Sequence, residues 1–294
     1  MEAFRAGIRS QSAMEYLMTY GWAILAIAIV MVSLYSLGIF NSGSLQPTAA
    51  PGSCEIVRTT AQASLAGQCN NLMPKYVSRL NGANSNIIST NKITFTSTSP
   101  WSISVWINVA KFSCSGSYWA GIVAIDSLNR VSIDEDCRNS NEITTWVYGV
   151  TEGGFPGAAS SLSSGKWYNY IATYDGNTHY IFYLNGKQVG AATDSASYSG
   201  SGYANIGYES FSSLYLNGSV ANIQVYNASL DNISAKALYQ GGVGGVPVDV
   251  RHLTAWWPLN GNANDYSGNN NQGTVSGQVV WNANWQSGYT APSS

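Results

Sequence analysis

The chain has a single run of adjacent carboxylates, Asp134-Glu135-Asp136. Two carboxylates on one face of a strand can cleave a glycosidic bond, one as nucleophile and one as acid. Cys137 follows directly, and the run lies between two expected strands, so we expect a solvated loop tethered by a disulfide. The sequence shows no Ser/His/Asp arrangement for acyl transfer and no phosphate-binding loop. These patterns predict a protein that is not an enzyme.

Four cysteines offer a second kind of chemistry, and three disulfide connectivities are possible among them. We expect the two local pairings, because each closes a modest loop and contributes about 2 to 4 kcal/mol of stability. Zinc is the competing use, but no Cys-x-x-Cys pair is present and both histidines lie elsewhere in the sequence. The predicted pairs are Cys54 with Cys69 and Cys114 with Cys137, and the histidines are His179 and His252.

Glu15 lies near the N-terminal end of an apolar segment, residues 11–40, that predicts a membrane-spanning helix. No charged residue occurs between Tyr16 and Ser53. As a helix, this segment would be about 45 Å long, which exceeds the roughly 30 Å hydrocarbon core of a bilayer. Arg5 and Arg9 precede it, so we expect a cytoplasmic N-terminus and an external C-terminal part. The run is too long for a cleaved secretory signal.

The junction Arg9-Ser10-Gln11-Ser12-Ala13-Met14-Glu15-Tyr16-Leu17 resembles the class III leader of archaeal type IV pilins. The resemblance implies that a prepilin peptidase removes the leader, residues 1–10, between Ser10 and Gln11. One departure is Ser10 itself, where the family usually has Gly or Ala. The new α-amine of Gln11 would then offer Glu15 a cation on the same helical face. In filaments of this family the residue resembling Glu15 is thought to set subunit register.

Composition favours an external β protein. Charged residues make up 10% of the chain and the net charge is −2, with no basic patch for nucleic acid. The chain is rich in Ser, Asn, Gly, Tyr and Trp, as β surfaces with many turns are. We expect a linker at residues 41–53 and a single head at residues 54–294.

The expected strands of the head are short and antiparallel. Residues 101–107 first alternate between apolar and polar side chains and then become apolar on both faces of the strand, as in a central strand. A second strand, 167–174, ends at an Asp175-Gly176 turn, and residues 180–189 form a hairpin around Asn185-Gly186. Such spacing predicts an antiparallel sandwich or jelly roll.

Gly165 to Gly176, followed by Tyr183 to Val189, resembles laminin-G-like, concanavalin A-type domains. The resemblance implies two curved antiparallel sheets that bind carbohydrate or protein, or serve as spacers. Residues 255–268 resemble a segment that opens the domain in many relatives, yet here they come last. We therefore expect a permuted domain in which 251–285 packs onto the strands of 76–110. The alternative is a truncated second copy.

Two kinds of site follow from the head sequence. Concanavalin-like folds often carry calcium, and Asp265 in the Asn/Gly-rich loop 260–273 is the candidate ligand. Its alternative role is to cap a tight turn, and Asn222 stands where relatives often present an acidic residue. Three glycosylation sequons begin at Asn217, Asn227 and Asn232.

The aromatic residues predict core packing more clearly than a sugar site. We expect four strand tryptophans to pack between or against the sheets and three tyrosines to lie at the surface. These residues are Trp106, Trp119, Trp146 and Trp167, and Tyr203, Tyr208 and Tyr215.

The sequence as a whole predicts a structural and adhesive subunit of an archaeal type IV pilus-like surface filament. It would be membrane-anchored before assembly, polymerise with itself and display a lectin-like head toward surface carbohydrate. The alternatives are a monomeric membrane-anchored adhesin with an uncleaved signal anchor and, more distantly, an anchored glycosidase.

Overall fold

The computed structural model describes residues 9–36, 48–70, 73–112, 119–126, 131–136, 141–147, 161–195, 197–211 and 213–292. The chain divides into two compact units, residues 1–46 and residues 47–294. The second unit begins six residues after the start of the predicted linker, so residues 48–53 belong to the head.

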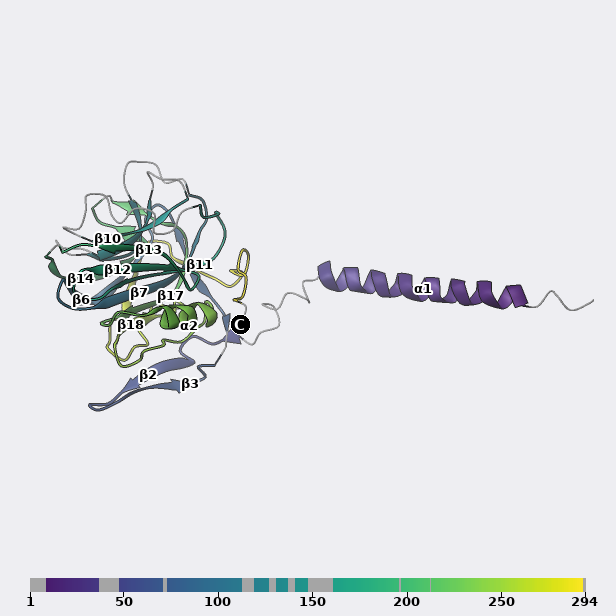
Figure 1. Ribbon diagram of the computed structural model, residues 1–294, viewed down its shortest axis with the longest axis horizontal. Coiled ribbons are helices and arrows are strands. Elements are labelled where there is room, and N and C mark those ends of the chain that lie inside the picture. Colours follow the sequence, from purple (N-terminus) through teal and green to yellow (C-terminus); the bar gives the residue numbers. More distant parts are fainter. Residues whose placement is uncertain are drawn as a thin grey trace, which may run out of the picture. The chain divides into compact units, whose positions relative to one another are not determined.

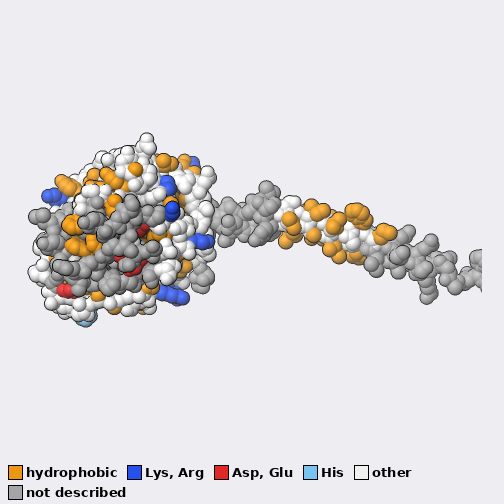
Figure 2. Space-filling view, turned by 90° about the horizontal axis from the view of Figure 1, so that it is seen from above, with side chains coloured by type: hydrophobic (Ala, Val, Ile, Leu, Met, Phe, Trp, Pro, Cys, Tyr) orange, Lys and Arg blue, Asp and Glu red, His pale blue; other side chains and the backbone are white. Residues whose placement is uncertain are grey.

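The first unit contains one helix, α1 (Arg9–Ser36). Where its side chains are described, mainly at residues 20–34, they are mostly apolar and largely exposed, as Figure 2 shows. Among the described residues, no helix combines the length and the hydropathy that a membrane crossing requires. The predicted span 11–40 extends beyond this described stretch and stays a prediction.

The second unit is a sandwich of two large, mainly antiparallel sheets, drawn in Figure 1. This confirms the predicted all-β fold. The first sheet has the order β13-β12-β11-β7-β17-β5-β20, and β18 also pairs with β17. Its strands are β13 (Lys187–Thr193), β12 (His179–Leu184), β11 (Tyr168–Tyr174), β7 (Trp101–Val109), β17 (Asn217–Tyr226), β5 (Val77–Asn81), β20 (Val280–Asn282) and β18 (Leu253–Trp257).

The second sheet has the order β10-β9-β8-β14-β6-β19, and the short pair β15 and β16 joins it beside β8. Its strands are β10 (Ile143–Val147), β9 (Val131–Asp136), β8 (Trp119–Asp126), β14 (Ser199–Ile206), β6 (Asn86–Thr96), β19 (Gly273–Ser276), β15 (Tyr208–Glu209) and β16 (Leu214–Tyr215).

Strand β7 shows why the sandwich forms where it does. Trp101, Ile103 and Val105 belong to the core cluster of apolar side chains drawn from both sheets. The alternate residues Ser102 and Ser104 are buried too, on the opposite face. A central strand with both faces covered needs such small polar residues to have partners. The Ser102 hydroxyl donates to Thr173 Oγ1 at 2.8 Å on the neighbouring strand β11.

The predicted hairpins of the first sheet are present. Strands β11 and β12 are joined by the Asp175-Gly176 turn, and β12 and β13 by the Asn185-Gly186 turn. Asn185 and Gly186 both have positive φ, 50° and 71°, as a two-residue type I′ turn requires. These turns fix the register of three neighbouring strands.

The C-terminal segment completes both sheets. Strand β18 pairs with β17, β19 pairs with β6, and β20 pairs with β5. Residues 251–285 therefore pack onto the region 76–110 as predicted. Because its strands join the same sandwich, this segment is part of the one head and does not start a second copy.

Smaller elements lie against the outer face of the first sheet. The parallel pair β1 (Thr48–Ala49) and β4 (Met73–Pro74) brackets a hairpin of β2 (Cys54–Arg58) and β3 (Ala63–Gly67). Helix α2 (Asn232–Gln240) is capped by Asp231, whose side chain accepts from Ser234 N, and Figure 1 shows it lying near β17 and β18. Its buried Ala235 and Leu238 pack in a cluster with Tyr226 and Trp256.

Candidate functional site

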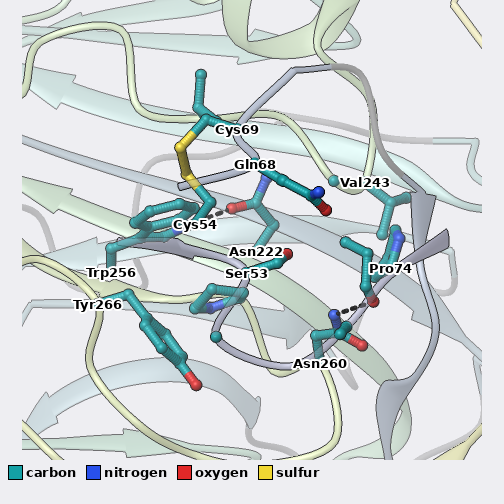
Figure 3. A pocket seen from close by; sticks show the side chains of 16 residues that line it. Ser53, Cys54, Gln68, Cys69, Pro74, Asn222, Val243, Trp256, Asn260 and Tyr266 are labelled. Carbon is teal, nitrogen blue, oxygen red and sulfur yellow. Dashed lines mark hydrogen bonds between the residues drawn. A yellow bond between two sulfur atoms is a disulfide. The ribbon is translucent and has the colours of Figure 1, made fainter. Parts of the chain in front are cut away.

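The candidate site is a small hollow between the β2–β3 hairpin and the sandwich, with a cavity volume of about 50 Å³. Figure 3 shows its side chains: the Cys54–Cys69 disulfide forms one wall, and Trp256 and Tyr266 lie on the sandwich side. The loop 243–246 after α2 and the segment 49–53 close the remaining sides. Segments far apart in the sequence therefore build this hollow together.

The disulfide wall confirms one of the two predicted cysteine pairs. Cys54 and Cys69 join the two ends of the hairpin. Ile56 is buried in the cluster under this hairpin, and its N–H donates to the Tyr266 carbonyl at 2.8 Å. The hairpin is therefore tied both to itself and to the sandwich. The second predicted pair, Cys114 with Cys137, lies outside the described residues.

Arg58 fixes the far end of the hairpin. Its Nε donates to Ser267 O at 2.7 Å, and its Nη2 donates to Val250 O at 3.0 Å and Leu253 O at 2.6 Å. A guanidinium that satisfies three carbonyl oxygens replaces bonds that these groups would otherwise make to water. The hairpin wall is thus held at both ends, which gives the hollow a defined shape.

Asn222 holds the aromatic side of the hollow in place. This residue is buried, has φ 48° and lies at a register shift of β17. Its Nδ2 donates to Gly245 O at 2.7 Å, and its Oδ1 accepts from Trp256 Nε1 at 2.8 Å and from Gln224 Nε2 at 3.0 Å. An aspartate here could not donate to Gly245, so the amide fits this position.

Asn260 connects the segment 49–53 to the same site. Its Oδ1 accepts from Tyr76 N at 2.9 Å, and its Nδ2 donates to Ala49 O at 2.9 Å. Two polar side chains remain with no hydrogen-bond partner among the described residues, the half-buried Ser53 and the exposed Gln68. Both line the hollow, so their hydroxyl and amide groups are available to a ligand.

The chemistry of the hollow is neutral. None of the described residues that line it carries a charged side chain. The groups present are amide and hydroxyl groups beside aromatic rings, which are the groups that ligand-binding pockets use to orient a ligand. Amide and hydroxyl groups beside aromatic rings match a ligand that presents hydroxyl groups and apolar C–H faces. The sequence did not predict that these residues form one site, although it singled out Asn222 and the segment containing Trp256.

Asp265 lies just behind the hollow and organises a turn. Its Oδ1 accepts from Trp256 N and Ser267 N, both at 2.9 Å. Its Oδ2 accepts from Ser267 Oγ at 2.8 Å and from Asn271 N at 2.7 Å. Four donors around one carboxylate favour the capping role, because N–H groups repel a cation. Within the described residues no cluster of three or more His, Cys, Asp and Glu side chains occurs, and calcium at Asp265 stays a prediction.

The prediction for the acidic run was wrong. Asp134, Glu135 and Asp136 lie on strand β9, between β8 and β10, and all three are buried. Pairing on both sides makes this segment a strand, although charged residues usually indicate a loop. Ser132 Oγ donates to Asp134 Oδ2 at 2.6 Å. Because alternate residues share a face, Asp134 and Asp136 lie on one side of the sheet and Glu135 on the other.

The remaining predicted residues are distributed as follows. Trp106, Trp119 and Trp167 are buried and Trp146 is half-buried. Tyr203 is exposed, whereas Tyr208 and Tyr215 are half-buried with their rings 4.5 Å apart. The three sequon residues are exposed. They are Asn217, Asn227 and Asn232. The predicted cleavage and assembly residues Ser10, Gln11 and Glu15 fall within α1, but their side chains lie outside the described part.

Comparison with known proteins places this architecture in a family. Residues 81–232 match the laminin-G-type model described as the concanavalin A-like lectin/glucanases superfamily. The match covers more than half of the chain, which therefore belongs to this superfamily. No curated protein shows significant similarity to the chain.

Several solved structures are partly similar to this chain. A proposed carbohydrate-binding protein from Bacteroides ovatus ATCC 8483 is 15% identical with a TM-score of 0.52, and the match covers 75% of this chain and 66% of that one. A heptameric pentraxin from Limulus polyphemus is 12% identical with a TM-score of 0.43, covering 70% and 94%. Mouse laminin alpha1 domains LG4-5 are 16% identical with a TM-score of 0.41, covering 59% and 46%. This chain spans just under two thirds of the Bacteroides protein, and likeness at 15% identity concerns the fold alone.

Proposed function

We propose that this protein is a cell-surface carbohydrate-binding protein whose head binds a neutral saccharide at the surface around the hollow beside Cys54–Cys69. The observation that carries the proposal is the lining of that hollow, with Trp256 and Tyr266 on one side, Ser53 and Gln68 unpartnered among the described residues, and no charged side chain. Membership of a superfamily that includes lectins supports this choice of ligand class.

The binding proposal is tested with two variants of the same hairpin. Gln68→Ala removes an exposed amide from the hollow, whereas Gln62→Ala removes an exposed amide that lies outside it. Binding of the full chain to immobilised mannan and dextran is measured by biolayer interferometry. One lost hydrogen bond of about 0.5 to 1.5 kcal/mol weakens binding roughly twofold to tenfold in Gln68→Ala. Equal affinity of the two variants for a bound polysaccharide, or no binding of either, overturns the proposal.

We further propose that α1 carries this head as the assembly helix of an archaeal type IV pilus-like filament at the cell surface. Support comes from the leader-like junction before Gln11 and from Glu15 within the helix. After cleavage by a prepilin peptidase, the Gln11 amine would pair with Glu15 of the same or a neighbouring copy.

The N-terminal residue of the mature protein decides between this proposal and an uncleaved membrane-anchored adhesin. Mass spectrometry of protein sheared from cells is expected to find Gln11 at the N-terminus. Electron microscopy of the same material is expected to show filaments with peripheral knobs. Retention of residues 1–10 would contradict the filament proposal and favour the anchored monomer.

One observation keeps a glycosidase as the distant alternative. Asp134 and Asp136 occupy alternate positions of β9, a spacing that puts two carboxylates on one face. Asp134→Asn and Glu135→Gln variants would be compared with the unaltered chain for release of reducing ends from polysaccharide. Turnover that is lost in Asp134→Asn and kept in Glu135→Gln would favour the enzyme; no turnover in any of them removes it.

A further inference from the structure

A second groove lies on the outer face of the first sheet, away from the hairpin hollow. Its cavity volume is about 320 Å³. It is bordered by residues 163–168, by the Asn185-Gly186 turn, by Tyr239 of α2 and by residues 288–290. None of its lining residues lines the hollow beside Cys54–Cys69. The groove is therefore a separate site.

Close backbone contacts fix the walls of this groove. Gly186 has φ 71°, and a Cβ added there would lie 3.1 Å from both Lys236 Cα and Tyr239 Cβ. Gly288 has φ 76°, and an added Cβ would lie 1.8 Å from the Gly165 carbonyl oxygen. Only glycine permits such approaches. The turn is thus pressed onto α2, and the C-terminal segment onto the loop before β11, so the groove is preformed.

Aromatic rings form the base of the groove. Trp106 is buried, and its ring stacks on Tyr239 with centroids 5.8 Å apart and an interplanar angle of 19°. Tyr239 and Tyr168 are half-buried, so each presents part of its ring to the groove. Half-exposed rings held by packing suit the apolar face of a sugar ring, because they lose little conformational entropy on binding.

Polar groups at the rim complement this base. Asn185 Oδ1 accepts from Asn169 N at 2.9 Å, and its Nδ2 has no partner among the described residues. Tyr168 Oη accepts from Ser163 N at 2.9 Å, which leaves its hydroxyl hydrogen to donate. Asn185 Nδ2 and the Tyr168 hydroxyl therefore can each donate a hydrogen bond to a hydroxyl or carboxylate oxygen of a ligand.

The charge of the groove is positive although the whole chain carries −2. Lys166 is the one charged side chain among the described residues that line it. Lys187 follows the Gly186 turn, and Lys236 lies next to it on α2. All three lysines are exposed, and none forms an ion pair with a carboxylate of the described residues. Unpaired ammonium groups beside amide donors and aromatic rings complement a carboxylate.

We propose that this groove binds a carboxylate-bearing saccharide, with Lys166 as the cation that recognises the acid group. The sugar ring lies against Tyr168 and Tyr239, and Asn185 donates to its oxygens. This site goes beyond the neutral-saccharide hollow and does not depend on it.

The test measures binding of the full chain in detergent to polygalacturonate at low and at physiological salt. Lys166→Gln is expected to weaken binding by about fivefold or more, since a charge-assisted hydrogen bond is lost. Lys166→Arg keeps the charge and is expected to stay within about twofold. Lys92→Gln is the matched control, because Lys92 lies over the Tyr203 ring on the other sheet and its loss changes the net charge equally.

Three outcomes overturn the proposal. Equal weakening in Lys166→Gln and Lys92→Gln would show a non-specific charge effect, and unchanged affinity in Lys166→Gln would show that the groove is not used. Displacement of polygalacturonate by polyglutamate at equal charge concentration would show that the site recognises acid groups without the sugar. Mannan and dextran binding by Lys166→Gln reports separately on the hairpin hollow, so the two proposals fail independently.

Discussion

At the scale of single residues, the polar side chains near the hairpin hollow act mainly by holding neighbouring backbone. Asp265 is the strongest example, because its carboxylate accepts three backbone N–H bonds and one hydroxyl bond. Asn222 accepts from the indole N–H of Trp256 and donates to the backbone carbonyl of Gly245. These two residues shape the site from behind and leave contact with a ligand to others.

Replacing Asp265 by Asn is expected to lower the free energy of unfolding by about 2 to 3 kcal/mol. The amide can accept fewer bonds, and the charge that strengthens them is lost. Urea unfolding followed by tryptophan fluorescence measures the change, with Asp194→Asn, a substitution at a half-buried surface position, as control. A loss below about 0.5 kcal/mol would contradict the capping role. Stabilisation of the unaltered chain by calcium, absent in Asp265→Asn, would instead support the calcium prediction.

At the scale of elements, the turn between β11 and β12 is organised by one carboxylate. Asp175 Oδ1 accepts from the N–H groups of Asn177, Thr178 and His179, and Oδ2 lies 2.8 Å from His179 Nδ1. Partial burial alone would raise the pKa of Asp175, but these bonds outweigh it and hold the pKa at about 2, below its ordinary 3.8. The ionised carboxylate is therefore favoured by folding.

The sign of this shift predicts a pH dependence. A depressed pKa in the folded state gives stability that is full above the unfolded pKa and is lost as the pH falls from about 4 through about 2. Asp175→Asn keeps an acceptor for the backbone but does not titrate. We expect the free energy of unfolding to fall more steeply between pH 4 and pH 2 in the unaltered chain than in this variant. Parallel curves from urea titrations at each pH would contradict the expectation.

The elements also show what the sequence could predict. Strand β7 and the two turns at Asp175-Gly176 and Asn185-Gly186 follow from patterns within a few residues, and they were predicted correctly. Strand β9 was not, because its burial depends on β8 and β10, whereas Asp134-Glu135-Asp136 by itself has the composition of a loop. The hairpin hollow escaped prediction for a similar reason. Gln68, Asn222 and Trp256 meet there only through pairing across the whole head, and no local pattern connects them.

At the scale of the whole molecule, the head depends on its last 40 or so residues. Strand β18 places Trp257, fully buried, in the main core. Strands β19 and β20 cover the edges of β6 and β5 in opposite sheets. The C-terminal segment therefore belongs to the core of the fold.

Deletion of residues 251–294 is expected to abolish folding, because it uncovers two sheet edges and removes three buried tryptophans, Trp256, Trp257 and Trp285. Near-ultraviolet circular dichroism and solubility of the shortened chain measure the effect, and deletion of residues 293–294 is the control. Co-expression of 251–294 as a separate peptide is expected to restore the signal, since the segment joins the head by strand pairing. A shortened chain that unfolds cooperatively near the original midpoint would contradict this role.

The disulfide-closed hairpin has a mechanical consequence. The chain enters the head at β1, which pairs in parallel with β4, and the loop between Cys54 and Cys69 follows directly. When the N-terminal segment is pulled, tension reaches the β1 contacts and the Asn260–Ala49 bond first. Once these contacts yield, the tension passes through the Cys54–Cys69 bond. It then bypasses the loop between the two cysteines, which are 15 residues apart in the sequence. Roughly 50 Å of chain is thereby withheld from extension. A head tethered in flowing liquid would keep its hairpin, and with it one wall of the hollow, under loads that strip the entry strand.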